Sequence, residues 1–169
     1  MHHIQTNPLA NESILYELLA QRKQTVSLAE SCTGGMVSSK IINVPGASSI
    51  LMEAFVTYSN ETKIKRLGVA KETLESFGAV SQECVKEMAI NLQKLTDCDL
   101  SISVSGIAGP SGGSVDKPIG TVWFGFKYLN QVYTDVKFFN GDRFEVREQA
   151  SDYAIIKAIE ILKSHPMSE

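Results

Sequence analysis

The chain has 169 residues and a mass of 18.5 kDa, with 43% hydrophobic and 21% charged residues. This length predicts one domain, and this balance is typical of a globular protein rather than a disordered one. A net charge of −3 at pH 7 provides no positive excess to attract nucleic acid or an anionic membrane. The only histidines are His2, His3 and His165, so serine–histidine and cysteine–histidine catalysis and histidine-based metal sites are not expected.

The cysteines and the N-terminus bear on the cellular compartment. Cys32, Cys84 and Cys98 form no C-x-x-C pair and leave one thiol over in any disulfide scheme, which predicts a reduced, cytoplasmic protein. No apolar signal region opens the chain, and no run of about 18 apolar residues occurs, so neither export nor membrane spanning is expected. We therefore predict one domain over residues 1–169, with residues 1–8 as a flexible extension.

Apolar periodicity in the first two thirds of the chain predicts alternating helices and strands. A helix opens at Asn7-Pro8, followed by a strand over residues 25–29, a helix over 34–42, and a strand through Leu51, Phe55 and Tyr58. A short helix capped by Asn60 and ended by Gly68, an amphipathic helix after Ser81, and a strand over 100–104 come next.

The last third begins with a glycine-rich loop over residues 106–118 and continues as a hairpin. The segments 119–128 and 132–139 are rich in β-forming residues, and Asp142 with Glu145 predicts a capping box that starts a long final helix. Because a sheet must bury both faces, we predict an α/β protein: a three-layer α/β/α domain with a mixed sheet that includes an antiparallel hairpin.

Three junctions between strands and helices are polar enough to carry chemistry, and the first contains Ser31. In α/β sheets, ligands bind where strands end. Glu30, Ser31, Thr33 and Gly34 lie at such a junction, where a hydroxyl and free backbone N–H groups at a helix start fit a nucleophile and an oxyanion site. The alternative is that Ser31 or Thr33 only caps the helix and that Glu30 only bonds backbone. Cys32 is a competing nucleophile, but no histidine is available to activate it.

The second junction offers a base. With histidine absent from the interior, Lys63 is the candidate, provided that burial lowers its pKa, and Tyr58 would relay the proton. The alternative is a strand-end tyrosine beside a solvated helix lysine.

The third junction is the glycine-rich loop that begins at Ser105 and Gly106. Its glycines allow backbone N–H groups to approach a phosphate or carboxylate, although it matches neither a Walker loop nor a dinucleotide motif. Arg143 and Arg147, four residues apart on the last helix, would clamp an anion or pair with Glu145 or Glu148. A hydroxyl nucleophile, a lysine base and an anion loop are complementary parts of an acyl-transfer site.

These residues carry a resemblance to a known family. Six blocks, at residues 28–35, 55–61 with Lys63, 78–81, 104–110, 117–122 and 141–143, closely resemble the CinA C-terminal domain family, whose stand-alone members include PncC-type nicotinamide-nucleotide amidases. The resemblance covers the chain from about Leu15 to Leu162. Longer family members carry an additional N-terminal domain, for which this chain leaves no room, so the pyrophosphatase activity of that domain is not expected.

The resemblance implies an amidase that converts nicotinamide mononucleotide to nicotinic acid mononucleotide and ammonia, without metal or cofactor. It assigns the nucleophile to Ser31 and its partners to Tyr58 and Lys63. Backbone N–H groups near Thr33 and Gly34 would hold the oxyanion, with Glu30 beside them, and the loop at Ser105 and Gly106, with Arg143, would hold the ribose phosphate.

Two alternatives remain open. The first is a non-catalytic nucleotide-binding or interaction module of the same family, because a shared fold does not establish turnover. The second is a phosphate-binding enzyme of different chemistry. The expected partner is a small-molecule substrate, with no nucleic acid and no membrane. Apolar helix faces leave a homo-oligomer, a dimer in the first instance, open beside an ordinary core.

Overall fold

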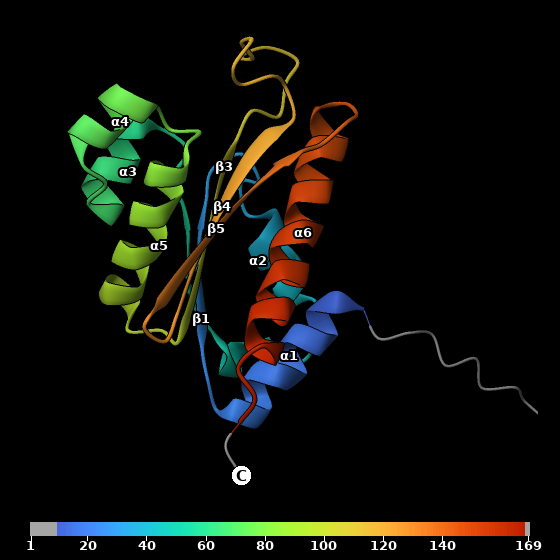
Figure 1. Cartoon of the computed structure of the whole chain (residues 1–169). Coiled ribbons are helices and arrows are strands. Elements are labelled where there is room, and N and C mark those ends of the chain that lie inside the picture. The colour runs from blue at the N-terminus through green and yellow to red at the C-terminus, as the bar shows by residue number, and fades with distance from the viewer. Residues whose placement is uncertain (1–9, 168–169) are drawn as a thin grey trace, which may run out of the picture.

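The computed structural model describes residues 10–167, so the expected N-terminal extension lies outside the described residues. A five-stranded sheet stands between two helical layers (Figure 1). The strand order is β2-β1-β3-β4-β5, with β1 (Val26–Glu30) parallel to β2 (Leu51–Val56) and β3 (Leu100–Gly106), and with β4 (Thr121–Tyr128) and β5 (Gln131–Phe138) added as an antiparallel hairpin. The predicted three-layer arrangement with a mixed sheet is confirmed.

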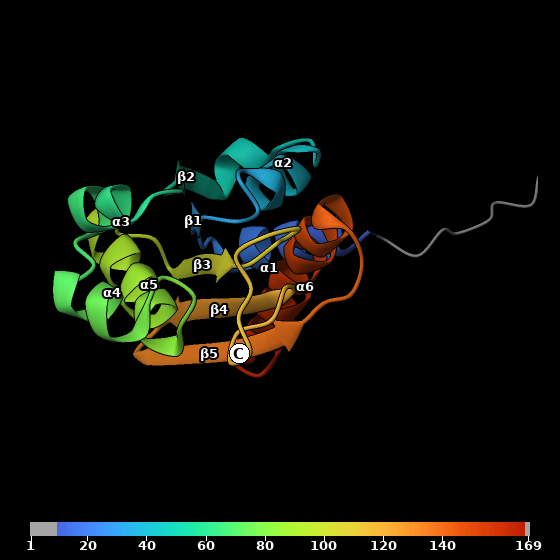
Figure 2. The ribbon, with the colours of Figure 1, turned by 90° about the horizontal axis from the view of Figure 1, so that it is seen from above.

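Helices cover both faces of the sheet, as Figures 1 and 2 show from two directions. One layer contains α1 (Asn11–Arg22), α2 (Met36–Ile42) and α6 (Arg143–Lys163), and the other contains α3 (Asn60–Leu67), α4 (Lys71–Phe77) and α5 (Gln82–Thr96); a short 3-10 helix spans Ala47–Ser49. The larger apolar cluster, with Leu28, Phe124 and Ile155, lies on the first side, and a smaller one, with Ala29 and Met88, lies on the second. Strand β1 is therefore buried along its whole length.

Helix starts and ends follow local chemistry. Ser81 caps α5, and Asp142 forms the predicted capping box of α6 with Glu145. Helix α3 ends at Gly68, as predicted, but Ser59 rather than Asn60 is its N-terminal cap. Side-chain oxygens at these positions accept hydrogen bonds from the unpaired N–H groups of the first helical turn.

Three helices differ from the sequence expectations. Helix α1 begins at Asn11, later than the expected start at Asn7-Pro8, which lies outside the described residues. Helix α2 begins at Met36 rather than residue 34, because Gly34 and Gly35 adopt positive φ angles of 59° and 99° and form a turn first. No periodic pattern predicts α4, since its seven residues bury only Thr73 and Leu74.

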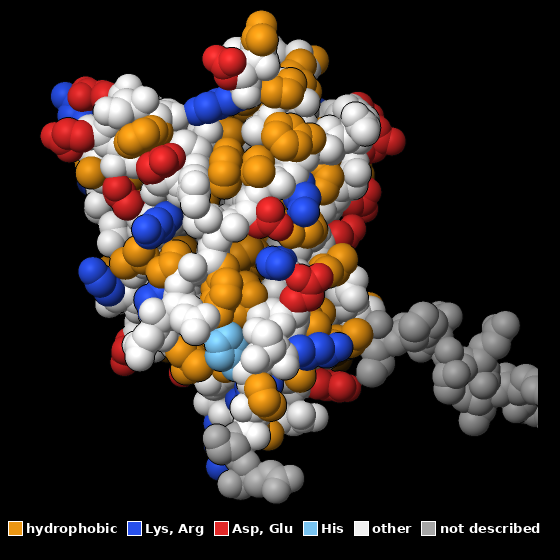
Figure 3. Space-filling view, viewed as in Figure 1, with side chains coloured by type: hydrophobic (Ala, Val, Ile, Leu, Met, Phe, Trp, Pro, Cys, Tyr) orange, Lys and Arg blue, Asp and Glu red, His pale blue; other side chains and the backbone are white. Residues whose placement is uncertain are grey.

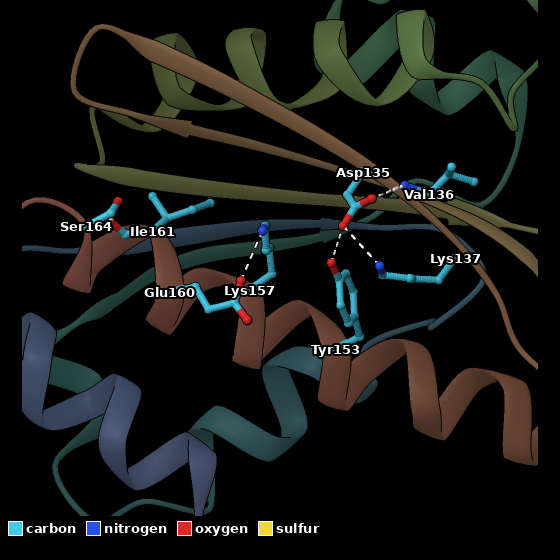
Figure 4. A network of polar contacts seen from close by, with 8 residues as sticks. All are labelled: Asp135, Val136, Lys137, Tyr153, Lys157, Glu160, Ile161 and Ser164. Carbon is cyan, nitrogen blue, oxygen red and sulfur yellow. Dashed lines mark hydrogen bonds and ion pairs between the residues drawn. The ribbon is translucent and has the colours of Figure 1, made fainter.

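Polar contacts tie the edge strand β5 to α6 (Figure 4). The Tyr153 hydroxyl donates to the Asp135 carboxylate, and Lys137 Nζ lies 3.4 Å from the same carboxylate. Burial raises the pKa of Asp135, but the hydrogen bond from Tyr153 and that from the Val136 N–H outweigh burial and hold the pKa below its usual value. These contacts join α6 to the antiparallel hairpin.

Charge is mixed on the face of the molecule in Figure 3, where basic and acidic side chains are interspersed over the surface.

Within residues 10–167, no helix combines the length and apolar character that crossing a membrane requires. Across the same residues, no three side chains of the His, Cys, Asp or Glu type gather as metal ligands would.

Candidate active site

The three polar junctions meet at the carboxyl ends of β1 and β3, which are parallel neighbours in the sheet. A cavity of about 240 Å³ opens at this edge, and we call it the serine cavity. Ten residues line it: Ser31, Cys32, Tyr58, Lys63, Ala79, Val80, Ser105, Gly106, Ala108 and Arg143. Segments far apart in the sequence therefore contribute most of the predicted site residues to one crevice.

Ser31 and Lys63 are in direct contact. The Lys63 Nζ lies 3.0 Å from the Ser31 Oγ and donates to the Thr57 carbonyl at 2.7 Å. Lys63 is only 1% exposed and Ser31 only 7%. Burial lowers the pKa of Lys63, because the charged ammonium loses its water. The alternative of a solvated helix lysine is therefore wrong.

The alternative that Ser31 or Thr33 caps α2 is wrong as well. The cap position is Gly35, which has no side chain to contribute. The Glu30 carboxylate takes this role from the end of β1, accepting from the N–H groups of Gly35 (3.0 Å), Val37 (3.1 Å) and Ser38 (2.9 Å). Glu30 thus bonds backbone, as its own alternative predicted, and the Ser31 hydroxyl is left to Lys63.

Cys32 is next to Ser31 but is poorly suited to be the nucleophile. It is buried, and burial raises the pKa of its thiol to about 12, so the reactive thiolate is scarce near neutral pH. The sulfur chemistry that the sequence left open is therefore disfavoured at this position.

The turn after Ser31 arranges the backbone N–H groups predicted to hold an oxyanion. The Gly34 N–H is engaged inside the turn, where it donates to the Ser31 carbonyl at 3.1 Å. The N–H groups of Cys32 and Thr33 donate to no other residue among residues 10–167, and the Cys32 N–H contacts only its own thiol. Of these two residues, Cys32 lines the serine cavity, whereas Thr33 is fully buried and does not.

Tyr58 and Arg143 form the outer wall of the serine cavity. The Tyr58 hydroxyl accepts from Arg143 Nη2 at 2.9 Å, and Arg143 Nη1 donates to the Gly109 carbonyl at 2.6 Å. Tyr58 is 61% exposed. Because Lys63 reaches Ser31 directly, no proton relay through Tyr58 is needed.

Ser105 and Gly106 end β3 and line the same cavity, Ser105 being 1% exposed. A second cavity, of about 670 Å³, adjoins the first and shares Ala108 and Arg143 with it. Its lining includes the exposed apolar side chains of Ile119 and Phe144. The crevice is therefore larger than the space next to the serine.

The sequence reasoning underestimated two residues. The Thr57 backbone carbonyl holds Lys63, which no side-chain pattern reveals. Arg147 donates to the carbonyls of Cys32 and Thr33, at 2.9 Å each, instead of joining Arg143 in an anion clamp. Neither arginine forms an ion pair with Glu145 or Glu148 in the part of the chain that the structure describes. The spacing of four residues was the available signal, since it places both arginines on one face of α6.

Residues 9–162 match the CinA C-terminal domain. The chain belongs to the CinA family. A CinA-like protein of Petrotoga mobilis is 47% identical over 152 residues, and a putative competence-damage inducible protein of Clostridium perfringens is 54% identical over 138 residues. These matches cover 90% and 80% of this CinA chain but only 38% and 33% of the two relatives, so the chain spans well under half their length.

Solved CinA structures share the fold. The CinA superfamily protein of Klebsiella pneumoniae has a TM-score of 0.88 and 34% identity, and the match covers 91% of this chain and 96% of that one. The competence/damage-inducible protein of Agrobacterium tumefaciens has a TM-score of 0.84 and 32% identity, covering 95% and 99%. The CinA domain in these proteins therefore has the same three-layer architecture.

Proposed function

We propose that this CinA-family chain is an amidohydrolase that converts nicotinamide mononucleotide to nicotinic acid mononucleotide and ammonia, as a step in pyridine nucleotide recycling in the cytoplasm. The observation that carries the proposal is the buried contact of 3.0 Å between Lys63 Nζ and Ser31 Oγ. A hydroxyl beside a desolvated amine is a nucleophile with its own base. The contact supports the reaction type, and the family resemblance supports the substrate.

The chemistry follows from this pair. Neutral Lys63 takes the Ser31 proton as the oxygen attacks the carboxamide carbon, and the carbonyl electrons move onto the oxygen. The tetrahedral intermediate collapses when the C–N bond breaks and Lys63 returns the proton to the leaving nitrogen, which departs as ammonia. Water then attacks the acyl-serine with Lys63 as base, releasing the acid and restoring the Ser31 hydroxyl. No step in this sequence requires a metal or cofactor.

The outer part of the site is suited to the rest of the nucleotide. Arg143 carries a permanent positive charge at the rim of the serine cavity, and Ser105 and Gly106 add small polar groups on the β3 side. We assign the ribose phosphate to this region, where the Arg143 guanidinium would attract it and the Tyr58 hydroxyl would contact it.

The decisive experiment is ammonia release from nicotinamide mononucleotide by the purified chain and its Ser31→Ala variant. We expect wild-type turnover, and a loss of at least about 10³-fold in Ser31→Ala with substrate binding retained. Ser48→Ala, at an exposed serine in the 3-10 helix, is the control and should retain full activity. Absence of ammonia from the wild type at any substrate concentration would instead support the non-catalytic module, and full activity in Ser31→Ala would support a different chemistry.

A further inference from the structure

An arginine from the far end of the chain holds the turn that follows Ser31. Arg147, in the second turn of α6, donates through Nε to the Cys32 carbonyl and through Nη2 to the Thr33 carbonyl, both at 2.9 Å. A guanidinium is planar and rigid, so two such bonds fix the orientation of two successive peptide groups.

The hold extends along the turn, because each peptide group is planar and trans and its C=O and N–H point in opposite directions. The Thr33 carbonyl shares its plane with the Gly34 N–H, which donates to the Ser31 carbonyl at 3.1 Å. The Ser31 carbonyl in turn shares its plane with the Cys32 N–H. Arg147 therefore sets the direction of the Cys32 N–H through two linked peptide planes.

Gly34 makes the close approach of Arg147 feasible. Its φ is +59°, and a Cβ at this position would lie 3.2 Å from Arg147 Nη2, so a side chain would press on the guanidinium. Turn and arginine are thus matched to each other rather than merely adjacent.

The Cys32 N–H belongs to the residue directly after Ser31, at the wall of the serine cavity. Cys32 lines the serine cavity, and its N–H donates to no other residue in the described part of the chain, its one partner being its own uncharged thiol, a weak acceptor. The backbone N–H of the residue after a nucleophilic serine is a recurrent oxyanion donor, because it lies beside the carbonyl that the serine attacks.

We propose that Arg147 is a positioning residue that directs the Cys32 N–H toward the oxyanion formed when Ser31 attacks its substrate. The inference rests on the proposed function in one respect, namely that Ser31 is the nucleophile. The oxyanion exists only in the transition state and the intermediate, so weakening this donor lowers kcat and leaves KM almost unchanged. A contribution of Arg147 to stability alone would not produce this separation.

The test compares Arg147→Lys with Arg22→Lys. A lysine keeps the charge of Arg147 but cannot hold two carbonyls in one plane. Arg22 is a matched control, because it also donates to two backbone carbonyls, those of Leu162 and His165 at 3.0 Å each, at the other end of α6. Both variants lose the same kind of contact, and only one loses it beside Ser31.

Two readouts are measured on the full chain. The first is kcat and KM on nicotinamide mononucleotide. The second, independent of that substrate, is the rate of Ser31 labelling by a fluorophosphonate probe, followed by intact mass. In this reaction the Ser31 Oγ–P bond forms as the P–F bond breaks and fluoride leaves, and the Ser31 proton passes to Lys63. Negative charge develops on the phosphoryl oxygen, where the Cys32 N–H would stabilise it.

For Arg147→Lys we expect the labelling rate and kcat to fall by about 10- to 100-fold, with KM within about twofold of wild type. Arg22→Lys should keep its labelling rate, kcat and KM within about twofold of wild type. Its melting temperature should fall by about as much as that of Arg147→Lys. If Arg147→Lys fails to fold, Arg147→Gln, whose amide keeps a single donor nitrogen, replaces it, and the same losses in labelling rate and kcat are expected. Equal labelling rates in wild type and the Arg147 variant, or equal slowing in Arg147→Lys and Arg22→Lys, would overturn the role of Arg147 and leave the proposed function standing. A wild type that is not labelled would overturn Ser31 as nucleophile, and with it both this inference and the proposed function.

Discussion

The Lys63 side chain is 1% exposed beside Ser31, and burial lowers its pKa below the usual lysine value because the charged ammonium loses its water. The neutral amine is the base, so kcat/KM should rise with pH through the lowered pKa of Lys63 and level off above it. The thiols of Cys32 and Cys84 have pKa values raised to about 12 and 11, so they stay uncharged across this rise. The measurement is kcat/KM for ammonia release between about pH 5 and pH 10.

Lys63→Arg is the comparison variant for this profile. A guanidinium stays protonated at every pH of the series, so it cannot act as base and should give no turnover at any point. A flat profile for the wild type, or an active Lys63→Arg, would contradict the assignment of the base.

The sequence predicted Ser31 as nucleophile because its hydroxyl lies at a glycine-rich helix start, and Lys63 as base because the interior offers no histidine. It did not predict that they touch. That contact depends on the rotation of α3 about its axis, which turns Lys63 and Leu67 toward α5 and the sheet and leaves Lys65 outside. Such a rotation is decided by packing between distant segments, and the sequence therefore left a relay through Tyr58 open.

At the level of the elements, a carboxylate from a strand orders the start of a helix. Glu30 accepts three N–H bonds around the first residues of α2, and its negative charge also favours the positive end of the helix. We predict that Glu30→Gln lowers the free energy of unfolding by about 1–2 kcal/mol, since the amide loses the charge and one acceptor oxygen. Because the same turn follows Ser31, kcat should fall as well. Urea denaturation and steady-state kinetics measure the two effects.

Asp99→Asn is the matched control at the opposite end of β1. Its carboxylate accepts the Thr25 N–H at 2.8 Å, so the variant should lose comparable stability without losing activity. Full kcat in Glu30→Gln would argue that the α2 start and the Ser31 turn are independent.

Local patterns predicted most elements but not this cap. Ser81 and Asp142 cap helices immediately after them in the sequence, so their side chains are visible as local signals. Glu30 reaches over a glycine turn to residues five to eight positions later, and α4 is too short to show a periodic stripe. These features depend on the course of the turn and on packing, which single-sequence patterns do not encode.

For the whole molecule, alternation of helices and strands was enough to predict three layers and a mixed sheet, because sheet faces must be covered. The strand order, with β1 between β2 and β3, was not predictable, because it depends on which way each connection crosses the sheet. That order is what joins the two helical layers at one site. The turn carrying Ser31 is held from α6 in one layer, whereas Lys63 comes from α3 in the other.

Burial of Lys63 lowers the free energy of unfolding of the whole chain. The folded pKa lies below the unfolded value, so between the two values the unfolded chain binds more protons and stability rises with pH; below the folded pKa the full cost of a buried ammonium remains. Lys63→Met keeps the length of the side chain without the charge. We predict that it raises stability at pH 6 by about 1–2 kcal/mol, or about 2–8 °C in melting temperature, and by less near pH 10, with no turnover at either pH.

Lys65→Met, at an exposed position of the same helix, should show no such dependence on pH. Thermal unfolding of the three proteins across this pH range measures both effects. A melting temperature for Lys63→Met below that of wild type at pH 6 would mean that the hydrogen bonds of the amine to Ser31 and Thr57 outweigh its desolvation. Burial of the catalytic base would then not destabilise the folded chain.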